Sequence, residues 1–167
     1  IQTFYPDNNW DLRDFRKSQS EEIQIIADGK GPRNQQQQYP TSVIIYDNGE
    51  GQHPKDFENT FLSLLKGNKN DVHFVQGKYN MGGSGAIVFC GKKRYQLIAS
   101  KRYDNSGNFG FTLIREHPKT DDDRSKETWY EYLLIDNEIP SFPIESLDLG
   151  LENRLFKTGT IIKMYSY

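Results

Sequence analysis

Residues 43–51 read Val43-Ile44-Ile45-Tyr46-Asp47-Asn48-Gly49-Glu50-Gly51. The β-branched run at the start predicts a buried strand, and the two glycines after Asp47 predict where that strand ends. A carboxylate at a strand end can accept a hydrogen bond from an exocyclic amine, and glycine lets the backbone pass close to a flat ligand because it has no Cβ. The pattern is found at sites for polar heterocycles, and the bare pattern is more typical of an ordinary turn.

A second glycine cluster follows later and reads Gly77-Lys78-Tyr79-Asn80-Met81-Gly82-Gly83-Ser84-Gly85-Ala86. The apolar residues 87–90 behind it predict that this loop enters a helix. A helix N-terminus presents unpaired backbone N–H groups and a partial positive charge, so it can bind phosphate. Gly82, Gly83 and Gly85 would let these amides surround an anion, while Ser84 and Lys78 would add a hydroxyl and a positive charge. The alternative is a flexible surface loop.

The remaining pattern predicts the fold class. Strands are expected at 23–27 and 41–46 as antiparallel neighbours, at 95–100 and 109–115 as a hairpin, at 129–135, and at 158–165, where the last strand closes the sheet. A helix is expected to begin at Pro54 and to turn Phe57, Phe61, Leu64 and Leu65 toward the core before it ends near Gly67. Residues 139–155 are expected to form an irregular connection, with room for a short helix. The class is therefore α+β, a two-layer sandwich in which a mixed, mainly antiparallel sheet carries helices on one face.

Composition narrows the class of protein. The 167 residues fit one domain, expected at 21–167 behind an N-terminal arm at 1–20. A net charge of −2 shows no global basic signature for nucleic acid or a membrane surface. The single cysteine, Cys90, excludes an internal disulfide, is expected to be buried, and fits a reducing compartment such as the cytoplasm. The sequence shows no membrane-spanning run and no signal peptide, and it contains no zinc-ligand spacing and no P-loop motif.

The order of these motifs resembles the ATP-binding domain of the GHKL superfamily, which includes DNA gyrase, the large heat-shock chaperones, histidine kinases and MutL. Asp47-Asn48-Gly49-Glu50-Gly51 matches the Asp-x-Gly-x-Gly box, residues 77–86 match the lid with its second glycine box, and Gly159-Thr160 matches the late Gly-Thr strand. The resemblance spans most of the chain, from about residue 23 to 167, and implies a Bergerat-type fold.

The resemblance also implies roles for these residues. Asp47 and Thr160 would read adenine, with Gly49 and Gly51 beside it. Gly82, Gly83, Ser84 and Gly85 would hold the phosphates, and Lys78 in the lid could approach them. Tyr79 and Met81 would be apolar contacts of the lid, and Gly77, Asn80 and Ala86 complete the nucleotide-binding segment. ATP and Mg²⁺ are the expected ligands. Lid closure would drive a conformational change in a larger protein and favour homodimerisation, with further domains upstream or downstream.

One element of the superfamily has no match before Asp47. It is a helix of the form Glu-x-x-x-Asn-x-x-Asp-Ala, whose glutamate activates water and whose asparagine holds Mg²⁺. We therefore expect either that this helix is encoded upstream and the chain is a fragment, or that the chain is a non-catalytic interaction module that keeps the fold without hydrolysis. ATPase activity is expected only if the missing helix is supplied. An unrelated α+β binding domain with coincidental glycine loops is the third alternative.

Overall fold

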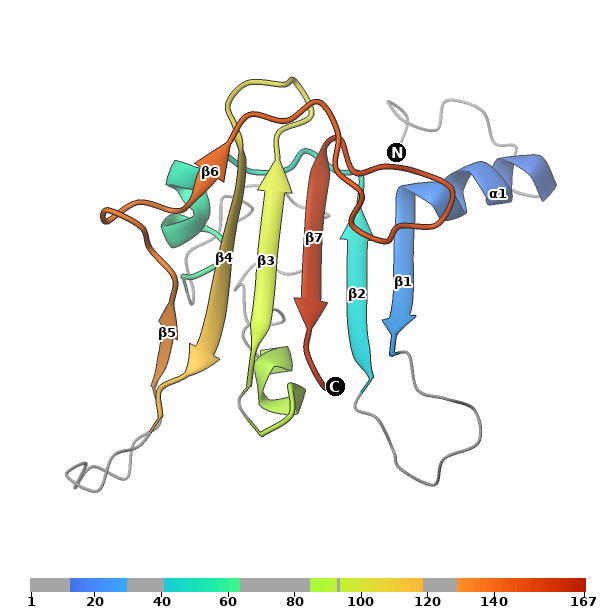
Figure 1. Ribbon diagram of the computed structural model, residues 1–167. Coiled ribbons are helices and arrows are strands. Elements are labelled where there is room, and N and C mark those ends of the chain that lie inside the picture. Colours follow the sequence, from blue (N-terminus) through green and yellow to red (C-terminus); the bar gives the residue numbers. More distant parts are fainter. Residues whose placement is uncertain (1–12, 30–40, 64–84, 93, 119–128) are drawn as a thin grey trace, which may run out of the picture.

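A seven-stranded sheet forms the centre of the computed structural model, which describes residues 13–29, 41–63, 85–92, 94–118 and 129–167 (Figure 1). Six strands follow each other in the order β1-β2-β7-β3-β4-β5, and β6 pairs with β4. The strands are β1 (Ile23–Asp28), β2 (Ser42–Asp47), β3 (Gln96–Lys101), β4 (Phe109–Glu116), β5 (Tyr130–Tyr132), β6 (Ser141–Phe142) and β7 (Gly159–Met164). The helical elements are α1 (Arg13–Glu22), η1 (Pro54–Asn59) and η2 (Ile87–Phe89).

Every strand pair in the described residues is antiparallel, which confirms the expected antiparallel character of the sheet. β1 pairs with β2 and β3 pairs with β4, as the sequence predicts. β7 does not lie at an edge. It is inserted in the middle of the sheet, between β2 and β3, so it joins the two hairpins (Figure 1).

The pairing register separates the side chains of the sheet into two faces, because successive residues of a strand point to opposite sides. One face carries Ile45, Ile162 and Ile98 in neighbouring strands, and the other carries Tyr46, Ile161 and Ala99. We call the first the site face, because it also carries Asp47 and Thr160, which are partners in the register. The second we call the back face.

The helical segments that cover the site face are shorter than predicted. η1 is a 3-10 helix that ends at Asn59, because the N–H of Thr60 bonds to the carbonyl of Phe57 at 3.2 Å and the backbone at Thr60 leaves helical geometry (φ −122°, ψ −82°). Phe57 is buried and packs against Ile98, as the apolar spacing predicts. The expected continuation through Leu64, Leu65 and Gly67 lies outside the described residues.

The helix expected after the glycine box is also short. Residues 85 and 86 are helical and lead into η2, a 3-10 segment of three residues. Ile87 and Cys90 are buried there against Met164 of β7, so the prediction that Cys90 is a buried residue is confirmed.

Residues 144–156 cover the back face without forming the short helix considered for this connection. Leu151 and Phe156 are buried against Ile44, Tyr46 and Phe109. Phe156 meets the rings of Tyr46 and Phe109 edge-on, at centroid distances of 5.9 and 5.4 Å. The irregular segment therefore supplies the apolar cover that one side of the sheet requires.

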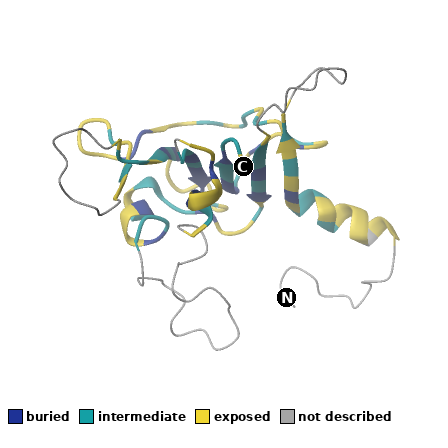
Figure 2. Cartoon of the chain, turned by 90° about the horizontal axis from the view of Figure 1, so that it is seen from below, coloured by how far each residue is buried: buried dark blue, intermediate teal, exposed yellow. Residues whose placement is uncertain are grey.

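α1 leads directly into β1 and ends at Glu22, two residues after the predicted end of the N-terminal arm. Figure 2 shows that most of this helix is exposed. Among the side chains of this helix that the structure describes, those of Gln19, Glu21 and Glu22 are partly buried. The first twelve residues of the predicted arm lie outside the described residues. None of the helices described is both long and apolar enough to cross a membrane.

Candidate functional site

A row of polar side chains crosses three neighbouring strands at one end of the site face. Asp47 ends β2, Thr160 lies opposite it on β7, and Ser100 lies opposite Thr160 on β3. Residues directly opposite each other in antiparallel strands have side chains on the same face. We call these three residues the polar row. It unites Asp47 and Thr160, the two residues that the sequence predicts to share a pocket.

Ser100 is the member of the polar row that the sequence analysis missed. It is fully buried, and its hydroxyl makes three contacts. It accepts a hydrogen bond from the backbone N–H of Gln52 at 2.9 Å and donates one to the carbonyl of Gly159 at 2.8 Å. It also lies 3.1 Å from the hydroxyl of Thr160. Ser100 therefore connects the segment after Gly51 to the Gly159-Thr160 pair. A serine within a β-strand carries no motif, so only the register reveals this role.

The first glycine box is held by local contacts. Asp47 is exposed, and its Oδ1 accepts the backbone N–H of Gly49 at 3.0 Å. Gly51 has a φ of +63°, and a Cβ there would lie 2.0 Å from the carbonyl oxygen of Lys101. The packing of Gly51 on β3 thus requires a glycine at this position by itself, in addition to the predicted approach of a ligand.

The glycine of the late Gly-Thr pair lets two strands approach each other. Gly159 has a φ of +98°, and a Cβ at this position would lie 2.0 Å from the carbonyl oxygen of Asp47 and 2.9 Å from the Cα of Asn48. Any other residue would push β7 away from β2 next to the Asp47–Thr160 pair. Gly159 therefore has a structural role in placing the two predicted adenine contacts side by side.

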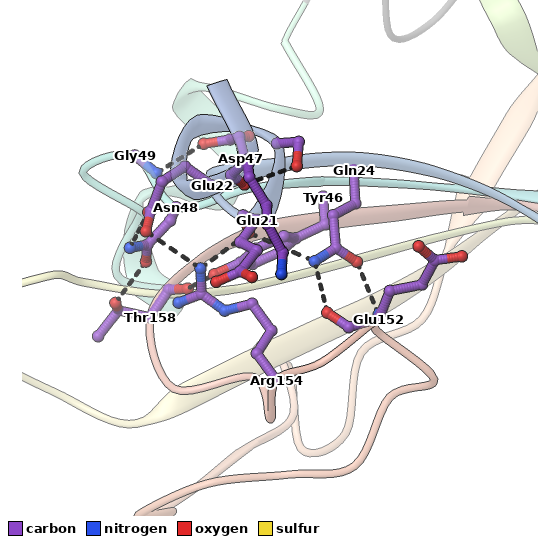
Figure 3. A network of polar contacts seen from close by, with 12 residues as sticks. Glu21, Glu22, Gln24, Tyr46, Asp47, Asn48, Gly49, Glu152, Arg154 and Thr158 are labelled. Atoms are coloured by element: carbon purple, nitrogen blue, oxygen red, sulfur yellow. Dashed lines mark hydrogen bonds and ion pairs between the residues drawn. The ribbon is translucent and has the colours of Figure 1, made fainter. Parts of the chain in front are cut away.

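Asn48 links the glycine box to two remote segments (Figure 3). Its backbone N–H donates to the carbonyl of Glu22 at 2.8 Å, and its side-chain amide donates to the carboxylate of Glu22. Its side-chain carbonyl accepts the hydroxyl of Thr158 at 3.0 Å. The residue that follows Asp47 is thus tied both to the end of α1 and to the entry of β7.

Arg154 extends this network to Tyr46, whose side chain lies on the back face (Figure 3). Arg154 donates to the carbonyl of Glu21 at 2.9 Å, lies 3.4 Å from the carboxylate of Glu22, and places its guanidinium 5.1 Å from the centre of the Tyr46 ring. Burial raises the pKa of Tyr46 to about 12, and the negative charges of Glu22 and Asp47 act in the same direction against the opposing charge of Arg154.

Apolar side chains flank the polar row at the edge of the sheet. Ile23 of β1 is the register partner of Asp47, and Ile25 is the partner of Ile45. Ile23 and Ile25 are 63% and 74% exposed, although they lie on the site face with its buried residues. The carboxylate of Asp47 therefore has an apolar surface on one side and hydroxyl groups on the other, an arrangement suited to a flat heterocycle with polar edges.

Gly85 and Ala86 lie over the opposite end of the same face. Ala86 and Val43 both pack against the buried cluster that contains Met164, and Val43 precedes Asp47 by four residues along β2, which is about 13 Å of strand. Gly85 lines an apolar cavity of about 520 Å³, whose wall also includes Phe61 and Ile87. The polar row and the start of η2 are thus separated along the strands by a distance that an elongated ligand could span.

The other predicted residues of the second glycine box lie outside the described residues. They are Gly77, Lys78, Tyr79, Asn80, Met81, Gly82, Gly83 and Ser84. Within the part of the chain that the structure describes, His, Cys, Asp and Glu side chains form no group of three able to hold a metal ion. Burial raises the pKa of the Cys90 thiol, which does not favour a role for this residue as a nucleophile at neutral pH.

The site is thus defined by the polar row, by the two glycine-dependent approaches at Gly51 and Gly159, and by the contacts of Asn48. Comparison with known proteins adds no further assignment. A scan against protein-family models finds no match to the chain, and a search of curated proteins finds none either.

Proposed function

We propose that the chain is an ATP-binding domain of the GHKL type, in which adenine is read at the polar row and the phosphates extend toward the second glycine box. The proposal includes the two-layer arrangement of this superfamily, with helices over the site face. The observation that carries it is the register pairing of Asp47 with Thr160, two residues far apart in the chain that separate motifs predict to meet.

The chemistry of the polar row supports adenine as its ligand. A carboxylate accepts hydrogen bonds and a hydroxyl can accept them, and the exocyclic amine of adenine donates two. The exposed side chains of Ile23 and Ile25 offer apolar area beside Asp47, on which a purine ring would pack. Gly85 and Ala86, at the far end of the face, would then lie near the phosphates.

Hydrolysis is not part of the proposal. In the superfamily that this chain resembles, the glutamate that activates water and the asparagine that holds Mg²⁺ lie on a helix without a counterpart before Asp47. The chain's own residues would bind and orient the nucleotide, and binding would drive a conformational change in a larger protein. The alternative is a non-catalytic interaction module that keeps the fold. It predicts that the full protein has no ATPase activity, whether or not it binds the nucleotide.

Calorimetric titration with a non-hydrolysable ATP analogue and Mg²⁺ tests the proposal. We expect Asp47→Asn to weaken binding by roughly tenfold to a hundredfold, because a hydrogen bond to a charged acceptor contributes about 1.5–3 kcal/mol. Asp104→Asn is a matched control, since the exposed Asp104 also accepts a backbone N–H two residues ahead, that of Ser106 at 2.9 Å.

The control should bind as the parent does. If Asp47→Asn also binds as tightly as the parent, the carboxylate does not read adenine and an unrelated α+β binding domain is the better description. If the parent does not bind the analogue at all, the proposal fails as a whole.

A further inference from the structure

The contacts of Ser100 determine which way the hydroxyl of Thr160 donates its proton. A serine hydroxyl has one proton to donate and two lone pairs to accept with. The carbonyl of Gly159 can only accept, so the contact of 2.8 Å uses the proton of Ser100. The N–H of Gln52 can only donate, so it uses one lone pair. The remaining lone pair of Ser100 faces the hydroxyl of Thr160 at 3.1 Å.

Thr160 is therefore the donor in its contact with Ser100. Its own single proton points to Ser100 on β3, so the oxygen of this side chain, which is 8% exposed, keeps only lone pairs for a ligand on the site face. Asp47, the register partner of Thr160, presents a carboxylate on the same face. Two neighbouring acceptors then face a ligand that approaches the polar row.

We infer that Ser100 is a positioning residue that makes the polar row selective for a purine with a 6-amino group over one with a 6-oxo group. This inference depends on the proposed function. The 6-amino group of adenine donates to both acceptors, whereas the 6-oxo group of hypoxanthine would place a third acceptor against them. An unpaired or repelled polar group in such a contact weakens binding more than a matched pair strengthens it.

ATP and ITP are the probes that test the inference, because they differ at this position of the base. We expect the parent to bind ATP more tightly than ITP in the presence of Mg²⁺. Ser100→Ala removes the acceptor for Thr160, whose hydroxyl then turns and donates to a 6-oxo group. The preference for ATP, measured as the ratio of the two Kd values, should fall by about tenfold.

A second variant keeps the test independent of the folding of Ser100→Ala. Thr160→Val removes the hydroxyl but keeps the shape and the β-branch, and it should lower the ATP preference by a similar factor. Adding Ser100→Ala to Thr160→Val should change the ratio no further, because Ser100 acts through Thr160. If the two substitutions instead lower the ratio independently, Ser100 does not act through Thr160.

Thr112→Val is the matched control. Thr112 is also a fully buried hydroxyl on the site face, and it donates to the carbonyl of Leu133 at 2.9 Å, away from the polar row. This substitution should lower the thermal midpoint of unfolding and leave the ATP to ITP ratio at the parent value. A loss of stability alone therefore does not reproduce the predicted change in selectivity.

The possible failures can be told apart. A parent that binds neither nucleotide refutes the proposed function and the inference with it. A parent that binds both equally well refutes the reading of the 6-amino group and leaves nucleotide binding intact. A Ser100→Ala variant that folds and keeps the parent's ratio refutes the role of Ser100 alone.

Discussion

Gly159→Ala is expected to destabilise the sheet next to the candidate site by far more than an ordinary glycine substitution. The added Cβ would lie 2.0 Å from the carbonyl oxygen of Asp47, and real Cβ contacts essentially never fall below 3.0 Å. β7 and β2 must therefore separate by about 1 Å at this point, the difference between the two distances. The backbone of Gly159, at a φ of +98°, is also one that alanine rarely adopts.

The expected magnitude is the sum of two costs. A left-handed backbone costs a non-glycine residue about 1–2 kcal/mol, and overpacking a tight contact costs about 1–3 kcal/mol, so Gly159→Ala should lower the free energy of unfolding by about 2–5 kcal/mol. A typical domain has about 5–15 kcal/mol in total. The variant should therefore unfold at a much lower urea concentration than the parent.

Gly150→Ala isolates the packing cost. Gly150 has a φ of +76°, and a Cβ there would meet no atom within 4 Å, so only the backbone cost of about 1–2 kcal/mol applies. Urea unfolding followed by far-UV circular dichroism measures both variants against the parent. If Gly159→Ala costs no more than Gly150→Ala, the close approach of β7 to Asp47 is not what requires a glycine at position 159.

Two further predictions concern buried groups with raised pKa values. Because the pKa of Tyr46 is raised to about 12, the neutral phenol stabilises the fold below pH 10, and this contribution, about 2–3 kcal/mol, is lost as the pH rises to 12. The free energy of unfolding of the parent should thus fall more steeply over this range than that of Tyr46→Phe, and parallel curves would contradict the burial effect. The thiol of Cys90 is 1% exposed with a raised pKa, so it should react with a disulfide reagent much more slowly in the native protein than in urea, and equal rates would show that it is accessible.

Local patterns predict the two hairpins well. The apolar runs that become β1, β2, β3 and β4 lie beside their partners in the chain, so alternation and turn residues are sufficient to pair them. The position of β7 was not predictable in this way, because its neighbours β2 and β3 are remote in the sequence. A strand that looks terminal in the chain is central in the sheet.

In the candidate site, too, local patterns predict some residues, and contacts between remote segments determine the others. Motifs identify Asp47 and Thr160, and the register places them side by side. The roles of Ser100 and Asn48 depend on contacts with residues that no local pattern connects to them. The end of η1 at Asn59 also differs from the apolar spacing, which continues beyond it, because spacing records which side chains face the core but not how tightly the backbone winds.

The central position of β7 has a consequence for how the protein is made. During synthesis the β1–β2 and β3–β4 hairpins leave the ribosome first, and each exposes an unpaired strand edge until residues 159–164 follow. The strand that fills this gap also brings Thr160 to Asp47, so the nascent protein acquires the polar row only in the step that completes the sheet. A chain that stops before residue 159 would therefore lack the polar row altogether, and its two hairpins would keep unpaired strand edges that favour aggregation.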